Sequence, residues 1–139
     1  MPLQPTHVVD AAAVIAYLKG ETGQDRFAAL LEDPRNVLAI HSVNLCEIYY
    51  NYLRSDSVEI AEQAWEKTTQ MCAVIDRLDD QFVKRVARWK GVVGLGLGDA
   101  FAAATAEEYA CQLVTTDHRD FDPIDQSGQL KIFWLRPAA

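Results

Sequence analysis

Short apolar runs alternate along this chain with longer amphipathic segments. The apolar runs predict five buried strands, at His7–Asp10, Asn36–Ile40, Ala73–Ile75, Leu113–Thr115 and Lys131–Leu135. The segments between them predict helices over Ala11–Gly20, Gly23–Leu31, Leu45–Arg54, Val58–Cys72, Asp79–Lys90 and from Asp99 onward. Strands that alternate with helices form a parallel sheet with helices on both faces. We therefore predict one α/β domain over residues 1–139, with three layers (α/β/α) around a parallel sheet of about five strands.

The apolar residues of three helices indicate how those helices should pack. The helix Leu45–Arg54 has an apolar seam at steps of three and four, made of Leu45, Ile48, Tyr49, Tyr52 and Leu53. The apolar residues of Val58–Cys72 are Ile60, Ala64, Trp65 and Met71, and those expected to face inward from Asp79–Lys90 are Phe82, Val86 and Trp89. After the fourth strand, Thr116–Phe121 is expected to form a tight turn.

Composition is typical of a soluble globular protein, with 50% hydrophobic and 24% charged residues. The longest apolar run, Ala11–Leu18, is too short to cross a bilayer, and the opening MPLQPTH has no signal-peptide pattern. The three cysteines are odd in number and have no CxxC spacing, which favours reduced thiols over a disulfide framework or a zinc site. We therefore expect a cytoplasmic protein with no membrane partner.

Four acidic residues lie where strands end or helices begin. Asp10 ends the first strand, Glu47 lies one turn into the helix after the second strand, and Asp99 and Asp117 flank the fourth. Each also has an ordinary explanation. Asp10 suits an N-cap, Glu47 could pair with a cap at Asn44 or face solvent, Asp99 suits a helix dipole, and Asp117 suits an Asx turn.

The joint placement of these acids favours a metal site. Right-handed crossovers bring the carboxyl ends of parallel strands to one edge of the sheet, so the four carboxylates should converge there. Without a cation they would repel one another and their pKa values would rise. An all-oxygen donor set favours Mg²⁺, with Mn²⁺ as a substitute, over zinc.

Two further patterns also have ordinary explanations. Lys84, Arg85 and Arg88, with Lys90 just beyond, form the densest basic patch, although such a patch is often a solvated helix face. The net charge of −7 argues against a phosphate-neutralising surface over the whole protein, but not against a local patch. Gly94-Leu95-Gly96 lacks the first-strand context of a dinucleotide-binding loop and is expected to form a close turn.

Three stretches of the chain resemble the PIN-domain ribonucleases, most closely the small bacterial toxins of the VapC type. VVDAAAVIAYL is similar to the opening strand and first acid of that family, and NLCEIYYNYL is similar to the helix with its second acid. GLGDAFAAATAEEYACQLVTTDHRDF is similar to its most specific block, including the closing pair Asp120-Phe121.

The resemblance implies a fold, an activity and partners. It implies parallel strands in the order 3-2-1-4-5, a metal-dependent endoribonuclease acting on RNA, a homodimer and, in the toxin members, a cognate antitoxin. It also implies that the catalytic metal ligands are Asp10, Glu47, Asp99 and Asp117. Thr115 and Asp120 would support these ligands, and a metal-activated water would attack the phosphodiester.

The match to the family is incomplete at one point. Family members usually have Ser or Thr directly after the first acid, whereas Ala11 and Ala12 follow Asp10 here. A catalytically degenerate module that only binds a partner is therefore one alternative, and metal titration would discriminate it. A structure-selective DNA nuclease is another, which matched RNA and DNA oligonucleotides would separate. If RNA is the substrate, Lys84, Arg85 and Arg88 are the candidates for holding its backbone.

Overall fold

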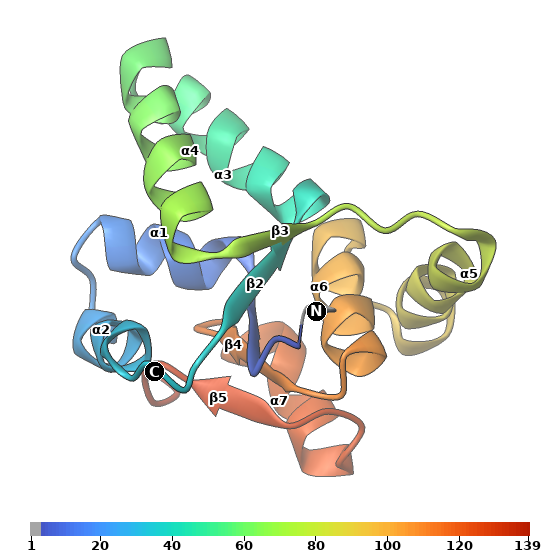
Figure 1. Ribbon diagram of the computed structural model, residues 1–139. Coiled ribbons are helices and arrows are strands. Elements are labelled where there is room, and N and C mark those ends of the chain that lie inside the picture. Colours follow the sequence, from blue (N-terminus) through green and yellow to red (C-terminus); the bar gives the residue numbers. More distant parts are fainter. Residues whose placement is uncertain (1–3) are drawn as a thin grey trace.

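The computed structural model describes residues 4–139. Five parallel strands form one sheet in the order β3-β2-β1-β4-β5, as the resemblance implied (Figure 1). The strands are β1 (His7–Val9), β2 (Leu38–His41), β3 (Ala73–Ile75), β4 (Gln112–Thr115) and β5 (Ile132–Trp134). The helices are α1 (Ala11–Leu18), α2 (Gln24–Glu32), α3 (Ser42–Ser55), α4 (Val58–Met71), α5 (Asp80–Arg88), α6 (Leu97–Glu108) and α7 (His118–Ser127), with a π-helical turn, η1 (Trp89–Val93), after α5. The predicted α/β class is confirmed.

Two apolar cores lie on opposite faces of the sheet. Alternate residues of a strand point to opposite faces, so Val8 of β1 enters one core and Val9 enters the other. The Val9 core is closed by α1, α2, α3 and α4. The Val8 core is closed by α5, η1, α6 and α7. The molecule therefore has the three predicted layers.

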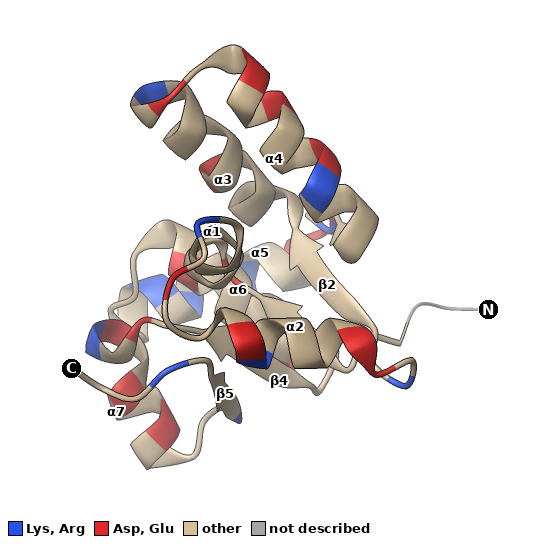
Figure 2. Cartoon of the chain, turned by 90° about the vertical axis from the view of Figure 1, so that its left-hand side faces the viewer, with Lys and Arg blue, Asp and Glu red and all other residues tan. Residues whose placement is uncertain are grey.

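Helices α3 and α4 form an antiparallel hairpin that rises from the body of the molecule (Figures 1 and 2). Small side chains of α4, Ala61 and Ala64, are buried where it packs on α3. Ile60 and Trp65, two of its predicted apolar residues, are exposed instead, as is Leu53 of the predicted α3 seam. Because the hairpin projects from the body, only one side of each helix is covered.

The segment after β4 differs from its prediction. The expected tight turn around Asp117 is the start of α7, a helix of ten residues with Asp117 as its N-cap. Phe121 and Ile124 anchor this helix in the core, and Gly128 ends it with a left-handed backbone. Pro123 lies inside α7. Proline has no N–H to donate, and five residues after the start of the helix, about one and a half turns, it argues against a helical prediction.

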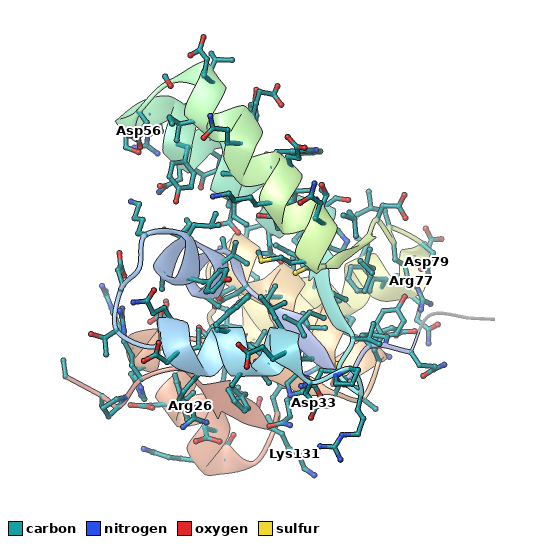
Figure 3. The ribbon with its side chains drawn as sticks, turned by 60° about the vertical axis from the view of Figure 1, so that its left-hand side comes forward. Arg26, Asp33, Asp56, Arg77, Asp79 and Lys131 are labelled. Atoms are coloured by element: carbon teal, nitrogen blue, oxygen red, sulfur yellow. The ribbon has the colours of Figure 1, made fainter. Side chains whose placement is uncertain are left out.

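Charged residues are distributed unevenly over the helices. Acidic positions are prominent on the outer sides of α2, α4 and α7 (Figure 2). Arg77 and Asp79, in the loop that leads from β3 to α5, form an ion pair (Figure 3). No helix in the described part of the chain is both long enough and apolar enough to span a membrane.

Candidate metal centre

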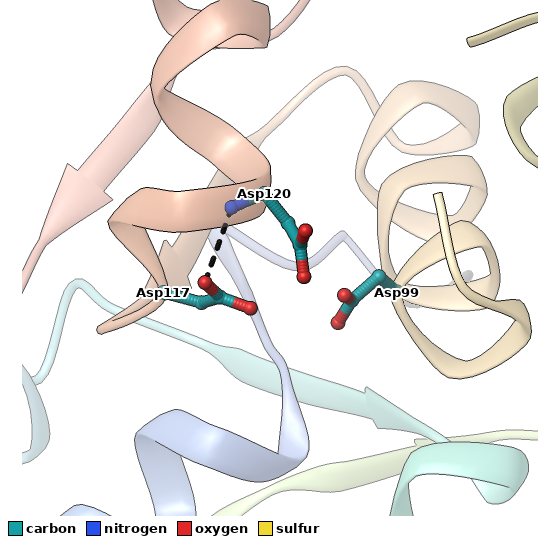
Figure 4. Close-up of side chains that lie close together, drawn as sticks. All are labelled: Asp99, Asp117 and Asp120. Atoms are coloured by element: carbon teal, nitrogen blue, oxygen red, sulfur yellow. Dashed lines mark hydrogen bonds between the residues drawn. The ribbon is translucent and has the colours of Figure 1, made fainter. Parts of the chain in front are cut away.

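Three carboxylates meet at the carboxyl edge of the sheet. Oxygen atoms of Asp99, Asp117 and Asp120 lie within 4.8 Å of one another (Figure 4). Asp99 lies in the first turn of α6, and the other two come from the start of α7. Within residues 4–139 this is the one group of three or more His, Cys, Asp or Glu side chains spaced to hold a metal ion. The predicted convergence of Asp99 and Asp117 is therefore present, and Asp120 joins them directly.

The α7 N-terminus fixes two of these acids relative to each other. The Asp120 backbone N–H donates a hydrogen bond of 3.2 Å to Asp117 Oδ1, which is the capping interaction of the helix. A cap and a residue three positions later lie on the same side of the first turn. The second carboxylate oxygen of Asp117 is not used by the cap, so it remains available to a ligand.

Asp10, between β1 and α1, is not part of the metal-spaced group and is almost completely buried, with 2% of its surface exposed. One of its oxygens caps α1 by accepting the Ala13 N–H at 2.8 Å. The other accepts the Thr115 hydroxyl at 2.5 Å. The same hydroxyl oxygen accepts the Asp117 N–H at 3.0 Å. Thr115 thus connects the first and the last of the four predicted acids.

Glu47 comes from α3 and, although it is a predicted ligand, it is not part of the metal-spaced group. Its Oε1 accepts a 2.8 Å hydrogen bond from Nδ2 of Asn44, and its carboxylate lies directly against Gly98. Asn44 is not the cap of α3, as one alternative had it, because His41 is. The pairing of Asn44 with Glu47 is nevertheless real.

The electrostatics of the buried acids favour a bound cation. Burial raises the pKa of Asp10 to about 7, and the charges of Asp117 and Glu47 act in the same direction. Burial also raises the pKa of Asp99 to about 8, with the charge of Asp10 and a hydrogen bond to Asp120 adding to it. A divalent cation would reverse this penalty, because it stabilises the ionised form of every carboxylate around it.

The donor set matches a hard cation. Burial raises the pKa values of Glu47 and Asp117 as well, so all four predicted acids share the same electrostatic penalty. No cysteine or histidine belongs to the metal-spaced group, and carboxylate oxygens are the ligands that Mg²⁺ and Mn²⁺ prefer. The residues present therefore fit a magnesium-type ion.

The basic residues of α5 lie far from this centre. Arg88 forms an ion pair with Glu107 at 2.8 Å, and Arg85 pairs with Glu108 at 2.9 Å. Those glutamates end α6, whereas Asp99 begins it, so about nine residues and about 13 Å of helix separate the two groups. Lys84 is exposed, and no ion pair of it occurs among the described residues.

Asn44 and Gly98 belong to the site although the sequence did not single them out as parts of it. The sequence suggested Asn44 only as a helix cap, and it gave no indication of a role for Gly98. The available signal was their spacing: Asn44 precedes Glu47 by one helical turn, and Gly98 directly precedes Asp99.

Solved structures with this fold include proteins of bacterial toxin–antitoxin systems. VapBC-1 from nontypeable Haemophilus influenzae superposes with a TM-score of 0.71 at 18% identity, covering 93% of this chain and 97% of that one. VapBC2 from Rickettsia felis, bound to a DNA fragment from its promoter, gives 0.72 at 18% identity, covering 91% and 96%. VapC20 from Mycobacterium tuberculosis, a toxin that cleaves the sarcin-ricin loop, gives 0.65 at 14% identity, covering 84% and 94%. At these identities the likeness establishes the fold alone.

Comparison with models of sequence families identifies the family of this chain. The comparison with curated proteins found no match. The family model described as PIN domain matches residues 7–126, which include the whole acidic cluster and every strand except β5. This chain belongs to the PIN-domain family.

Proposed function

We propose that this protein is a Mg²⁺-dependent endoribonuclease, the toxin component of a toxin–antitoxin pair. The observation that carries the proposal is the carboxylate cluster of Asp99, Asp117 and Asp120, within 4.8 Å at the sheet edge, with Asp10 and Glu47 beside it. A PIN domain with this cluster has the groups that hydrolysis of a phosphodiester requires.

The acids have distinct parts in this proposal. Asp99, Asp117 and Glu47 would hold the ion, and Asp10, predicted as a fourth ligand, would add negative charge beside them because both its oxygens already accept hydrogen bonds. Asp120 would supply a further oxygen or hold the others in place. Thr115 and the Ala13 N–H keep both Asp10 oxygens oriented. Mg²⁺, when bound, supplies activation of a water for attack on the phosphodiester and stabilisation of the charge that develops on the phosphate.

Partners follow from the same proposal. The similar structures from Haemophilus influenzae and Rickettsia felis are VapBC complexes, so we propose a cognate antitoxin as the protein partner of this chain. RNA is the proposed substrate, in keeping with the RNA-cleaving VapC20, which shares the fold. An enzyme acting on cellular RNA would work in the cytoplasm. The family resemblance also implies that the protein forms a homodimer.

Asp99→Asn provides the test. In the metal-free protein a carboxyl with a raised pKa destabilises the fold increasingly as the pH rises from about 4, its ordinary value, to about 8. The asparagine carries no charge, so the variant should be as stable as the wild type at pH 5 and at least as stable at pH 8. It should cleave RNA with Mg²⁺ at a rate near background. Matched RNA and DNA oligonucleotides establish which polymer the wild type cleaves.

Thermal melts with chelator and with Mn²⁺ complete the experiment. At a hundred times its dissociation constant Mn²⁺ should stabilise the wild type by about 2.7 kcal/mol, and Asp99→Asn should lose most of this. If Asp99 were only a helix-terminal acid, its substitution would cost a few tenths to about 1 kcal/mol and Mn²⁺ would raise neither melting temperature. A wild type that is indifferent to metal would end the nuclease proposal.

A further inference from the structure

Asn44 makes two hydrogen bonds that join separate parts of the metal centre. Its Nδ2 donates to Glu47 Oε1 at 2.8 Å, one turn along α3, and to the backbone oxygen of Gly98 at 2.9 Å, in the first turn of α6. Only 1% of the residue is exposed. A single amide group therefore connects the carboxylate of one predicted ligand to the backbone that directly precedes Asp99.

The orientation of this amide is determined by its surroundings. Both neighbours of Nδ2 are oxygen acceptors, so the opposite orientation would place Oδ1 against a carboxylate and a carbonyl. In the orientation observed, Oδ1 is buried and has no hydrogen-bond partner. A buried acceptor without a partner lowers stability, and an apolar side chain of the same size would avoid that loss. What an amide provides at position 44 is therefore the pair of hydrogen bonds from Nδ2 to Glu47 and to Gly98.

Gly98 provides an independent observation at the same place. A Cβ atom built on Gly98 would lie 2.4 Å from both carboxylate oxygens of Glu47. No real side chain tolerates that distance, so Glu47 would have to move for any other residue to occupy position 98. The backbone of Gly98 is an ordinary helical one, so a side chain at this position would disturb the place of the Glu47 carboxylate and not the backbone.

We propose that Asn44 is a positioning residue, which holds the Glu47 carboxylate in the gap at Gly98 and so sets its place relative to Asp99. This inference rests on the proposed function, because it assigns the purpose of the contact to metal binding. Glu47 comes from α3 and Asp99 from α6, and the amide is the polar connection between those two helices at the site. Without it, Glu47 would keep its charge but lose its fixed direction.

Asn44→Leu separates positioning from packing. Leucine fills a similar volume and removes the unpaired Oδ1, but it also removes the amide that donates to Glu47 Oε1 and to the Gly98 carbonyl. These effects on stability oppose each other, so the metal-free melting temperature should change little. Affinity for Mn²⁺, measured by electron paramagnetic resonance of the free ion, should fall about tenfold, as removal of an outer partner of a metal ligand commonly causes. RNA cleavage should fall at low Mn²⁺ and recover at high Mn²⁺.

Asn51→Leu is the matched control. Asn51 lies seven residues, or about two turns, further along the same side of α3, and its Oδ1 is also buried without a partner. It makes no hydrogen bond to an acid of the site among the described residues, so its substitution should leave Mn²⁺ affinity unchanged. Gly98→Ala approaches the same contact from α6 with Asn44 intact, and should also weaken Mn²⁺ binding.

The possible results distinguish this inference from the proposed function. Weaker Mn²⁺ binding by Asn44→Leu and Gly98→Ala, but not by Asn51→Leu, supports a positioning role. Equal Mn²⁺ affinity of Asn44→Leu and Asn51→Leu overturns that role and leaves the nuclease proposal intact. A wild type that binds no Mn²⁺ overturns both, because Glu47 would then have no ion to be positioned for.

Discussion

At the residue scale, Thr115 supports the first acid of the predicted site by donating its hydroxyl to Asp10. Ala11 and Ala12 have no hydroxyl to offer Asp10, which in the sequence suggested a degenerate module as an alternative. Both Asp10 oxygens are nevertheless occupied, one by the Ala13 N–H and the other by the Thr115 hydroxyl. The missing hydroxyl therefore does not leave Asp10 without support, and the departure from the family pattern is weak ground for an inactive module.

His41 is a buried residue with a role separate from the metal centre. Its Nδ1 accepts the Val43 N–H at 3.1 Å and caps α3, and its Nε2 donates to the Arg77 backbone oxygen at 3.0 Å. The ring is stacked on Phe82 with 4° between the planes. These bonds require the neutral form protonated at Nε2 alone, because a proton on Nδ1 would break the cap.

The stability of the protein should therefore depend on pH through His41. Burial lowers the pKa of its imidazole, against smaller opposing effects of the Arg77 hydrogen bond and of Asp76. A lowered histidine pKa stabilises the fold above about 6.5, the value in unfolded chains, and this contribution is lost as the pH falls below it. The loss cannot exceed about 1.4 kcal/mol per pH unit.

Urea unfolding at pH 7.5 and 5.5 measures this effect in the wild type and in His41→Asn. Asparagine can cap the helix but does not titrate in this range. The wild type should lose more stability between the two pH values than the variant does. The acids of the metal centre are common to both proteins, so their opposite dependence on pH cancels in the comparison. Equal losses would mean that His41 keeps its ordinary pKa in the fold.

At the element scale, strands were easier to predict than helix faces. All five strands are present, and β3 has the predicted bounds of Ala73–Ile75. The inner strands β1, β2 and β4 are largely buried, and parallel strands of this kind are short and continuously apolar, so their signal is local. The outer side of α4 could not be predicted, because an exposed Trp65 depends on the hairpin standing away from the body. Helix α7 was missed because its short sequence, HRDFDPIDQS, contains a proline and is rich in aspartate, which are both typical of turns.

The site was predictable only where its residues follow from the order of strands and helices. Asp10, Asp99 and Asp117 lie at strand ends or helix starts, which topology alone brings to one edge. The contact of Asn44 with Gly98 joins residues 54 positions apart and depends on how α3 and α6 approach each other. No pattern within one helix contains that information.

A prediction for one helix concerns the basic residues of α5. We expect its basic residues to contribute to RNA affinity and little to chemistry. Replacing Lys84, Arg85 and Arg88 with glutamine should weaken RNA binding and reduce its salt dependence by about one unit of slope for each phosphate that is no longer neutralised. The turnover rate at saturating RNA should barely change, since these residues lie at the opposite end of α6 from Asp99.

Two single variants serve as controls for the triple variant of α5. Lys67→Gln removes an exposed charge from α4 and should leave RNA affinity nearly unchanged. Because Arg85 and Arg88 pair with Glu108 and Glu107, their removal should also lower the melting temperature, whereas Lys84→Gln alone should not. If the triple variant binds RNA at low salt as tightly as the wild type does, the prediction is wrong. The two arginines would then serve only in ion pairs within the fold.

At the scale of the whole molecule, the α3–α4 hairpin carries several of the exposed large apolar side chains, although Leu78, Val92 and Leu97 are exposed elsewhere. Leu53, Val58 and Trp65 are exposed there, by 41%, 56% and 42%. The three tyrosines of α3 differ in their exposure and in their contacts. Tyr52 is buried, Tyr49 bonds to Glu62 and packs edge-on against Trp65, and Tyr50 is 41% exposed. A single helix seam thus leaves one aromatic residue free for an outside contact.

This surface predicts self-association, which the family resemblance also implies. Exposed aromatic residues are enriched at protein interfaces, and truncating one near the centre of an interface removes a disproportionate share of the binding energy. Sedimentation at micromolar concentration should show a wild-type dimer, and Tyr50→Ala should shift it toward monomer by at least about tenfold in dissociation constant, which corresponds to about 1.4 kcal/mol. Val92→Ala removes apolar surface that is 81% exposed but lies on η1, outside the hairpin, and should leave the dimer intact. A wild-type monomer, or a dimer that Tyr50→Ala does not weaken, would refute the assignment of the hairpin as the interface.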